Sequence, residues 1–433
     1  MRKRLVSITI TLILSVMLIG VISVSSIAIA KETIKFMAVA DPFFYALRDL
    51  IPEFEKETGI RVIPEGLAYD AWYSKALLDF SSHTANYDVV GVDTPVVSEW
   101  GEAGYLVDLG PYIAKDRAEL NVDDLIGVNA GRWRGTQFCL PLAGYVMLLH
   151  FRKDLFPKYG LIVPVTWEDY YNVGEKLVMD TNGDGKTDFW GTAFGCKRGV
   201  CVTQFWEQVY FTFGGKFFRD FEKGDYYPLL DEPIAQEATE FFHSLLKIAP
   251  PDVVNYDWFD VGEAMASGKV GMIYHWDVYS QTFENPEKSK VVGKVGWAKP
   301  PLKEGSGVVP TQAAPWTFGI NKDSKHKEAS WKFMKWVVSE EIQRKMAETG
   351  KLTSPIRLSV LNNPALQNKY PVLRAQYNAL LGGSWVVPYM PKYAEIQDKV
   401  LGLRLNQMLI GEISVKKALE LAQKEALRIL GFK

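Results

Sequence analysis

Acidic and aromatic side chains lie close together at several points of this 433-residue chain. Sugars need both kinds of group, because their C–H faces stack on flat aromatic rings and their hydroxyl groups hydrogen-bond to carboxylates, amides or backbone atoms. A buried polar partner also rejects a ligand that lacks the matching hydroxyl. The candidate ligand-binding residues that follow from this reasoning are Asp41, Phe44, Asp93, Trp276, Trp316 and Trp385.

The positions of these residues relative to expected strands and turns support a binding role. Asp41 follows an expected strand at residues 34–40, and Asp93 follows another at 88–92. Open α/β sheets bind ligands at such strand ends. Trp385 comes directly after a glycine-rich turn. A single tryptophan more often packs in a core than against a ligand, so a structural role remains the alternative for each. The tryptophans assigned to the core are Trp72, Trp206 and Trp258.

An acidic loop matches the first nine positions of an EF-hand calcium-binding loop. It carries side-chain oxygens at positions one, three, five and nine, glycine at six, and a backbone carbonyl ligand at seven. The predicted metal ligands are Asp180, Asn182, Asp184, Lys186 and Asp188. Position twelve is Gly191, where a bidentate glutamate is expected, so a metal-free turn is the alternative. The sequence thus predicts a structural Ca²⁺ ion and no required cofactor.

The three cysteines divide into a pair and a single residue. Cys196 and Cys201 enclose a short loop with a glycine turn, which predicts a disulfide, with two packed thiols as the alternative. Cys139 lies in an apolar run and is expected to be buried.

Motifs for enzymatic catalysis are missing from the sequence. The five histidines form no H-E-x-x-H pattern, and the chain has no G-x-S-x-G nucleophile elbow. Gly185-Lys186-Thr187 resembles the end of a phosphate-binding loop, but the required first glycine is Asp180. We therefore predict that the chain is not an enzyme. Because acidic residues are plentiful, a glycosidase with two carboxylates remains an alternative.

Short apolar runs alternate with amphipathic stretches, which indicates an α/β fold with largely parallel sheets. Strands are expected at 34–40, 61–63 and 88–92. Helices are expected at 43–57, 71–80, 169–179, 234–246, 327–348 and 414–430. The last helix has Ser414 as its N-cap and Gly431 as its stop signal.

The first thirty residues have the pattern of an export signal. Arg2, Lys3 and Arg4 precede an uncharged stretch that ends in Ala28-Ile29-Ala30, typical of a signal-peptidase site. We predict a signal peptide at 1–30 and an exported, periplasmic or extracellular protein. An uncleaved membrane tether is the alternative, because the uncharged stretch is long enough to span a bilayer. The net charge of −2 gives no general attraction to nucleic acid.

Several motifs in a fixed order resemble the extracellular solute-binding proteins of family 1, the group of maltose-binding protein. Each motif is weak alone, but their common order covers nearly the whole chain after the signal. The matching segments are 51–60 (IPEFEKETGI), 87–90 (YDVV), 103–109 (AGYLVDL), 140–142 with 151–156 (LPL and FRKDLF), 164–168 (PVTWE), 213–215 (FGG), 268–272 (GKVGM) and 331–333 (WKF). Arg152 departs from the family pattern, where asparagine is usual.

This resemblance implies a two-lobed α/β periplasmic-binding-protein fold with several hinge crossovers and a ligand cleft between the lobes. Lobe 1 would comprise 31–145 and 302–354, and lobe 2 would comprise 146–301 and 355–433. Tyr145 would then be a crossover residue that faces the cleft. The implied partners are a carbohydrate, expected to be an oligosaccharide, and the permease subunits of an ABC importer, with the chain acting as a monomer. A polyol phosphate or a peptide is the alternative ligand.

Overall fold

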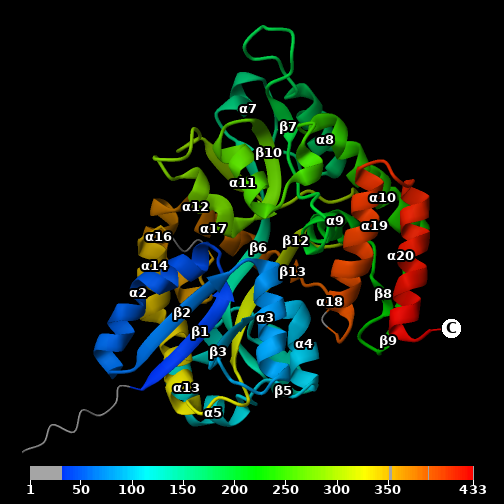
Figure 1. Ribbon diagram of the computed structural model, residues 1–433. Coiled ribbons are helices and arrows are strands. Elements are labelled where there is room, and N and C mark those ends of the chain that lie inside the picture. The colour runs from blue at the N-terminus through cyan, green and yellow to red at the C-terminus, as the bar shows by residue number, and fades with distance from the viewer. Residues whose placement is uncertain (1–31, 351–353, 389, 433) are drawn as a thin grey trace, which may run out of the picture.

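The computed structural model describes residues 32–350, 354–388 and 390–432, which form two α/β lobes joined by long strands (Figure 1). One mixed sheet runs through both lobes in the order β2-β1-β3-β12-β6-β10-β7, with β11 paired to β6 and β13 to β12. The two-lobed α/β architecture expected from the sequence is confirmed. The exact lobe boundaries stay a prediction.

Lobe 1 is built on three parallel strands, β1 (Thr33–Val39), β2 (Arg61–Leu67) and β3 (Val89–Val92). Their apolar side chains are covered by helices. The main helices are α2 (Pro42–Thr58), α3 (Tyr69–Ser81), α4 (Thr94–Glu102) and α13 (Lys327–Val338). Because the strands are parallel, their carboxyl ends meet at one edge of the sheet, and that edge faces lobe 2 (Figure 1).

Two long strands carry the chain between the lobes. The first part of β6 (Cys139–Arg152) pairs with β12 (Thr311–Ile320), and the last part pairs with β10 (Val270–Trp276) and β11 (Val295–Ala298). A register shift between Trp316 and Thr317 interrupts the β12–β6 ladder near its middle. The two lobes thus share continuous backbone hydrogen bonding through β6.

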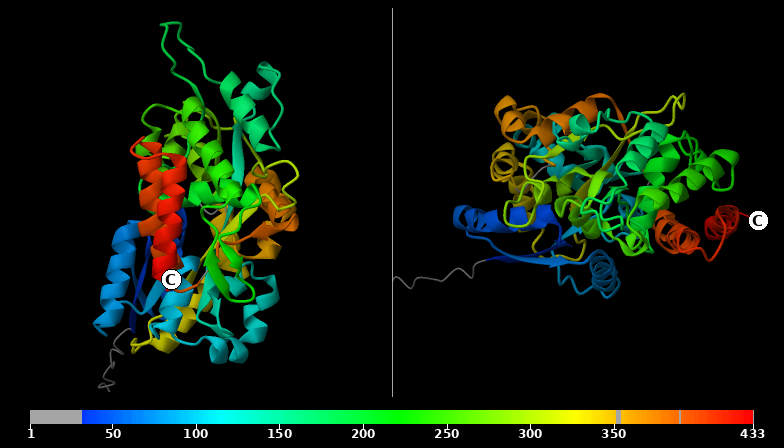
Figure 2. Two further views of the ribbon diagram at one scale, coloured as in Figure 1. Left: turned by 90° about the vertical axis from the view of Figure 1, so that its right-hand side faces the viewer. Right: turned by 90° about the horizontal axis from the view of Figure 1, so that it is seen from above.

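Lobe 2 surrounds the far half of β6 and strand β7 (Trp190–Thr192) with helices. The main ones are α8 (Trp167–Lys176), α9 (Val200–Thr212), α10 (Pro233–Ser244), α11 (Trp258–Ala266), α19 (Gly402–Leu409) and α20 (Val415–Leu430). The red C-terminal helix α20 lies along the outer side of the molecule, as both views of Figure 2 show. It packs against α19 and α10.

Further elements complete the fold. The remaining helices are α5 (Gly110–Lys115), α6 (Arg117–Leu120), α7 (Leu155–Lys158), α12 (Ser280–Phe283), α14 (Glu340–Glu348), α15 (Leu358–Leu361), α16 (Pro364–Lys369), α17 (Pro371–Leu381) and α18 (Tyr393–Glu395). The short strands are β4 (Arg132–Trp133), β5 (Thr136–Gln137), β8 (Phe218–Asp220), β9 (Asp225–Pro228) and β13 (Ser384–Trp385). A single π-helical stretch, Ile396–Leu401, connects α18 to α19.

Most helices and strands expected from the sequence are present, with ends that differ by a few residues. The exception is the expected helix at 327–348, which is wrong because two helices occupy this range. Ser339 leaves the helical conformation, with a ψ of 149°, and its side chain accepts a hydrogen bond from the backbone N–H of Ile342. Ser339 is therefore the N-cap of a second helix, and apolar periodicity alone did not reveal it.

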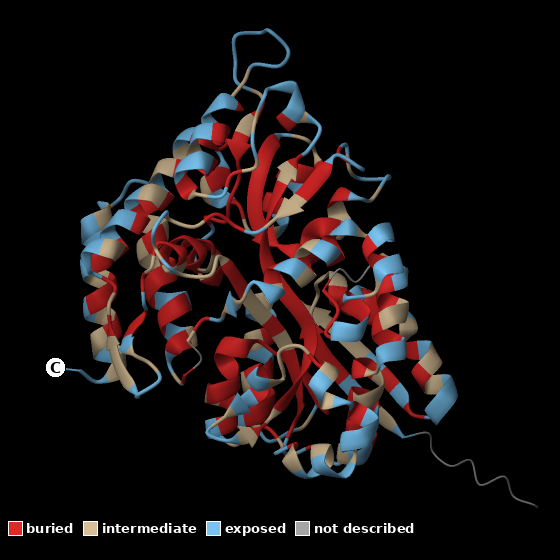
Figure 3. Cartoon of the chain, turned by 180° about the vertical axis from the view of Figure 1, so that it is seen from behind, coloured by how far each residue is buried: buried red, intermediate tan, exposed pale blue. Residues whose placement is uncertain are grey.

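The apolar core runs along both faces of the shared sheet. Figure 3 shows the central strands largely buried, whereas most exposed residues lie on the outer faces of the helices and in the loops. Cys139 is among the buried core residues, as predicted. The cores of the two lobes therefore meet at the crossover strands.

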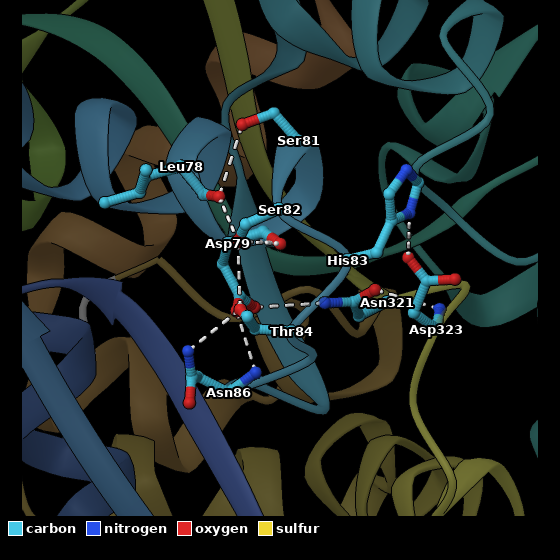
Figure 4. Close-up of polar contacts among 9 residues, drawn as sticks. All are labelled: Leu78, Asp79, Ser81, Ser82, His83, Thr84, Asn86, Asn321 and Asp323. Atoms are coloured by element: carbon cyan, nitrogen blue, oxygen red, sulfur yellow. Dashed lines mark hydrogen bonds and ion pairs between the residues drawn. The ribbon is translucent and has the colours of Figure 1, made fainter.

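A buried carboxylate fixes the turn after α3. The carboxylate of Asp79 accepts hydrogen bonds from the Thr84 hydroxyl (2.6 Å), the Asn86 backbone N–H (2.8 Å) and the Asn321 side chain (3.1 Å) (Figure 4). Asn321 directly follows β12, so this network ties α3 to a crossover strand. The C-terminal end of α3 is thereby held in place relative to the sheet.

No helix within the described ranges is long and apolar enough to cross a membrane. The predicted signal peptide at 1–30 lies outside the described residues.

Candidate functional site

A cavity of about 240 Å³ lies between the two lobes. Lobe 1 lines it with residues at the carboxyl ends of β1, β2 and β3, and the crossover strands contribute Tyr145, Ala314 and Trp316. Lobe 2 lines it with the start of α9, the start of α11, and the end of β10. The cavity is thus located where the parallel strands of lobe 1 end, as open α/β sheets generally place their ligands.

Two carboxylates define the lobe 1 wall. Asp41 is the N-cap of α2 and accepts a hydrogen bond from the backbone N–H of Phe44 (2.9 Å), and its other oxygen accepts one from the Tyr145 hydroxyl. Asp93 follows β3 and accepts a hydrogen bond from the Tyr69 hydroxyl (2.8 Å). Each carboxylate is therefore oriented by a tyrosine that also lines the cavity.

Burial raises the pKa of both carboxylates to about 6. The charged form is disfavoured because the protein has removed water from it, and the tyrosine hydrogen bonds offset only part of this effect. Ligand hydroxyl groups that donate to the two carboxylates would supply the missing hydrogen bonds to the charged form. The geometry and charge of Asp41 and Asp93 thus suit a ligand with several hydroxyl groups.

The lobe 2 wall is aromatic. Trp258 begins α11, and Trp276 ends β10. The indole N–H groups of both tryptophans donate to the same side-chain oxygen, Oε1 of Gln204 in α9, at 3.0 Å and 3.3 Å. Tyr279 adds a third ring and stacks on the buried imidazole of His275, with ring centroids 4.3 Å apart. Apolar ring faces and one polar clamp therefore oppose the carboxylates of lobe 1.

Aromatic contacts join the two lobes beside the cavity. The ring of Tyr69 in lobe 1 lies 6.0 Å from the ring of Trp258 in lobe 2, centroid to centroid. Tyr69 also makes an edge contact with Trp316 at 6.3 Å, and Trp316 packs against the buried Trp72 at 5.2 Å. The described structure therefore has the two lobes in direct contact at the cavity.

The charged residues that line the cavity are predominantly acidic. Five aspartates line it against two basic residues. The charged lining residues are Asp41, Asp70, Asp93, Asp257, Asp398, Lys197 and Arg198. Lys197 is paired with Asp257 at 3.2 Å. The pKa of Asp398 is raised by burial and by the nearby Asp70, and Lys399 and Arg198 offset only part of this increase. This balance is unfavourable for an anionic ligand.

The cavity brings together five of the seven ligand-binding candidates from the sequence: Asp41, Asp93, Tyr145, Trp276 and Trp316. The other two lie elsewhere. Phe44 points into the lobe 1 core, 4% exposed, where its ring packs near Phe36. Trp385 pairs with β12 through β13 and packs on Phe211, with centroids 4.6 Å apart.

Sequence reasoning missed several lining residues. Trp258 was assigned to the core, and Tyr69, Gln204 and Tyr279 were not singled out. Trp258 and Tyr279 each lie one or two residues from an aspartate, Asp257 and Asp277, which is the same signal that selected Trp276. No comparable local signal exists for Gln204, because it lies within a helix. The tryptophans Trp72 and Trp206 are buried, as their assignment to the core predicted.

The predicted calcium loop protrudes from lobe 2 between α8 and β7, above α7 and α8 in Figure 1. Asp180 accepts hydrogen bonds from the backbone N–H groups of Gly183 and Gly185, both at 2.7 Å, and these bonds lower its pKa. Asp188 accepts from the backbone and hydroxyl of Thr181. Within the described ranges, no group of three or more His, Cys, Asp or Glu residues is arranged to hold a metal ion. Calcium binding stays a prediction.

The predicted disulfide is wrong, because Cys196 and Cys201 are both free, buried thiols. Cys201 lies in the first turn of α9, and its sulfur packs against Gly195. The contact is so close that a Cβ atom at Gly195 would lie 2.6 Å from the sulfur. The Cys196 thiol instead donates to the carbonyl of Phe194 at 3.6 Å. Each sulfur therefore has its own packing partner, and Cys201 also lines the cavity.

The fold and the interlobe cavity define a two-lobed binding protein. Comparison with known proteins agrees, because the model of the bacterial extracellular solute-binding protein family matches residues 40–344. The chain belongs to this family. It is a solute-binding protein of the ABC transporter class, and the family places it outside the cytoplasm.

Three individual proteins illustrate the similarity. A solute-binding protein of Agrobacterium radiobacter, crystallised with ribitol, is 31% identical, with a TM-score of 0.85 over 92% of this chain and 98% of that one. A "probable amino-acid ABC transporter periplasmic-binding protein" of Sinorhizobium fredii is 26% identical over 83% of this chain and 80% of its own length. An erythritol/L-threitol-binding protein of Mycolicibacterium smegmatis is 22% identical over 76% of this chain and 72% of its own.

Proposed function

We propose that the ligand of this solute-binding protein is a small, uncharged polyhydroxy compound, either a sugar alcohol or a monosaccharide. The observation that carries this proposal is the interlobe cavity, in which aromatic rings of lobe 2 face the two tyrosine-bound carboxylates of lobe 1. At about 240 Å³ the cavity lies below the usual range for drug-sized ligands. It therefore favours a smaller ligand than the oligosaccharide expected from the sequence.

The relatives support a sugar alcohol. The Agrobacterium protein was crystallised with ribitol, and the mycolicibacterial relative is an erythritol/L-threitol-binding protein. The acidic lining argues against a polyol phosphate, because a phosphate group requires converging Arg or Lys side chains. Arg198 lines the cavity, but Lys197 is engaged by Asp257.

Ligand capture would proceed by closure of the two lobes. A ligand that contacts both walls favours the closed form, because only that form offers both sets of contacts. Tyr69 and Trp258, which touch across the lobes, would report this closure. Closure also removes water and so strengthens the polar contacts to Asp41 and Asp93. The closed surface would be recognised by the permease subunits of the importer.

The remaining features of the proposal come from the sequence and the family. The protein would act as a monomer, without catalytic turnover of its ligand, after removal of residues 1–30. A Ca²⁺ ion in the loop at 180–188 would have a structural role only.

The test is a calorimetric and thermal-shift panel on residues 31–433. It comprises four- to six-carbon sugar alcohols, monosaccharides and maltodextrins, with amino acids and glycerol phosphate as competing classes. A ligand at a hundredfold excess over its dissociation constant stabilises the folded state by about 2.7 kcal/mol. We expect this response with sugar alcohols or monosaccharides, without turnover. Trp276→Ala should abolish it, whereas Trp385→Ala, outside the cavity, should retain it. A response only to amino acids or maltodextrins would contradict the proposal.

A further inference from the structure

The side-chain amide of Gln204 has a fixed orientation, which follows from its two partners. The indole N–H of a tryptophan can only donate a hydrogen bond. The N–H groups of Trp258 and Trp276 both converge on one atom of Gln204, at 3.0 Å and 3.3 Å. That atom must therefore be the acceptor oxygen, and the amide cannot be flipped without placing donor against donor.

The amide nitrogen of Gln204 consequently points away from both indoles. It carries two N–H donors, and none of the described residues provides an acceptor for them in the hydrogen bonds of the structure. The nitrogen has no partner among these residues and yet is not among the buried polar atoms without one, so it is accessible to solvent, and Gln204 lines the cavity. An N–H donor thus faces the ligand space.

This donor differs in kind from the carboxylates that line the cavity. The carboxylates of Asp41 and Asp93 accept hydrogen bonds, and Lys197 is paired with Asp257. A ligand hydroxyl can donate its proton to a carboxylate and at the same time accept a hydrogen bond through its oxygen. With carboxylates and an amide donor in one cavity, a ligand hydroxyl can donate to a carboxylate and accept a hydrogen bond from the amide.

We propose that Gln204 determines ligand specificity in two ways: its oxygen sets the orientation of the Trp258 and Trp276 rings, and its nitrogen donates to one oxygen atom of the ligand. The inference rests on the proposed function, because it assumes a polyhydroxy ligand. A ligand that lacks the matching oxygen leaves the amide N–H unpaired in a site from which water is excluded, and such a loss lowers affinity about tenfold.

The test uses ribitol and singly deoxygenated ribitols with the wild-type protein and three variants. Gln204→Glu keeps an oxygen acceptor for both indoles but removes the N–H donor. Gln204→Leu removes both functions. Gln236→Leu is the control, because Gln236 is an exposed residue of α10 whose side chain hydrogen-bonds only to Glu240 among the described residues. Binding is measured by calorimetry, and the thirteen indole N–H resonances are followed by ¹⁵N–¹H NMR.

We expect wild-type protein to bind one deoxygenated ribitol about tenfold more weakly than ribitol. Gln204→Glu should bind ribitol about tenfold more weakly and lose this discrimination, whereas an effect of the added charge would weaken all ligands equally and preserve it. Gln204→Leu should shift two indole resonances in the ligand-free protein. The inference would be overturned if Gln204→Glu still discriminated about tenfold between ribitol and the deoxygenated ribitol. Unchanged indole resonances in Gln204→Leu would overturn it as well. If neither a sugar alcohol nor a monosaccharide binds the wild-type protein, the proposed function fails, while the indole resonances still test the positioning role.

Discussion

Ligand affinity should depend on pH through the two carboxylates of lobe 1. Burial raises the pKa of Asp41 and Asp93 to about 6. Under the proposed function, ligand hydroxyls would donate to the ionised form, so protons would compete with the ligand as the pH falls through 6. Affinity should therefore be highest above pH 7 and decline below it.

The magnitude follows from the fraction of each carboxylate that is ionised. With a pKa of about 6, this fraction is roughly 0.97 at pH 7.5 and roughly 0.09 at pH 5. If binding requires both carboxylates in the charged form, the dissociation constant rises about 100-fold between these two pH values, or about 2.7 kcal/mol. If it requires only one, the rise is about tenfold. Near pH 6, binding should also release about one proton in total.

The assay is calorimetry with the best sugar alcohol between pH 5 and pH 7.5, repeated at pH 6 in buffers with different ionisation enthalpies. Asp41→Asn is the matched variant. Asparagine keeps one oxygen that can accept from the Phe44 backbone N–H, its amide N–H can donate to the Tyr145 hydroxyl oxygen, and it does not titrate. Its affinity should change only about tenfold over the same range. A dissociation constant that stays flat from pH 7.5 to pH 5, with no proton released at pH 6, would refute the reasoning.

Three further outcomes are expected. Burial raises the pKa of Glu207 to about 8, and hydrogen bonds from Tyr393 and Gln397 offset only part of this increase. The protonated carboxyl group therefore stabilises the fold at low pH, and this stabilisation is lost as the pH rises from about 4.5 through 8. Glu207→Gln should narrow the difference in melting temperature between pH 5 and pH 8.5, and an unchanged difference would count against a neutral Glu207. Phe44→Ala should lower the free energy of unfolding by about 3–5 kcal/mol in urea titrations, yet leave the affinity of the folded protein within a few-fold, since the ring lies in the core. Calcium should raise the melting temperature of the wild-type protein but not that of Asp184→Ala. If calcium leaves the wild-type melting temperature unchanged, the loop at 180–188 is a metal-free turn.

The sequence was sufficient where short-range rules decide the structure. Asp41 and Asp93 could be predicted to face the cavity because each directly follows a parallel strand, and parallel strands end at a common edge. Ser414 and Gly431 were correctly assigned as the ends of the last helix, since capping depends on the residue itself and its immediate neighbours.

Only the tertiary structure could distinguish the tryptophans that line the cavity from those that do not. Trp385 follows a glycine-rich turn and looked exposed, yet it packs on Phe211, while Trp258 reaches the cavity from the first turn of a helix. Gln204 acquires its meaning only when α9 brings it beneath two indoles that are distant in sequence. The types and order of the strands and helices are set by local patterns of apolar residues. The composition of the site depends on how two lobes pack together, because contacts between residues far apart in the chain leave no periodic signal in the sequence.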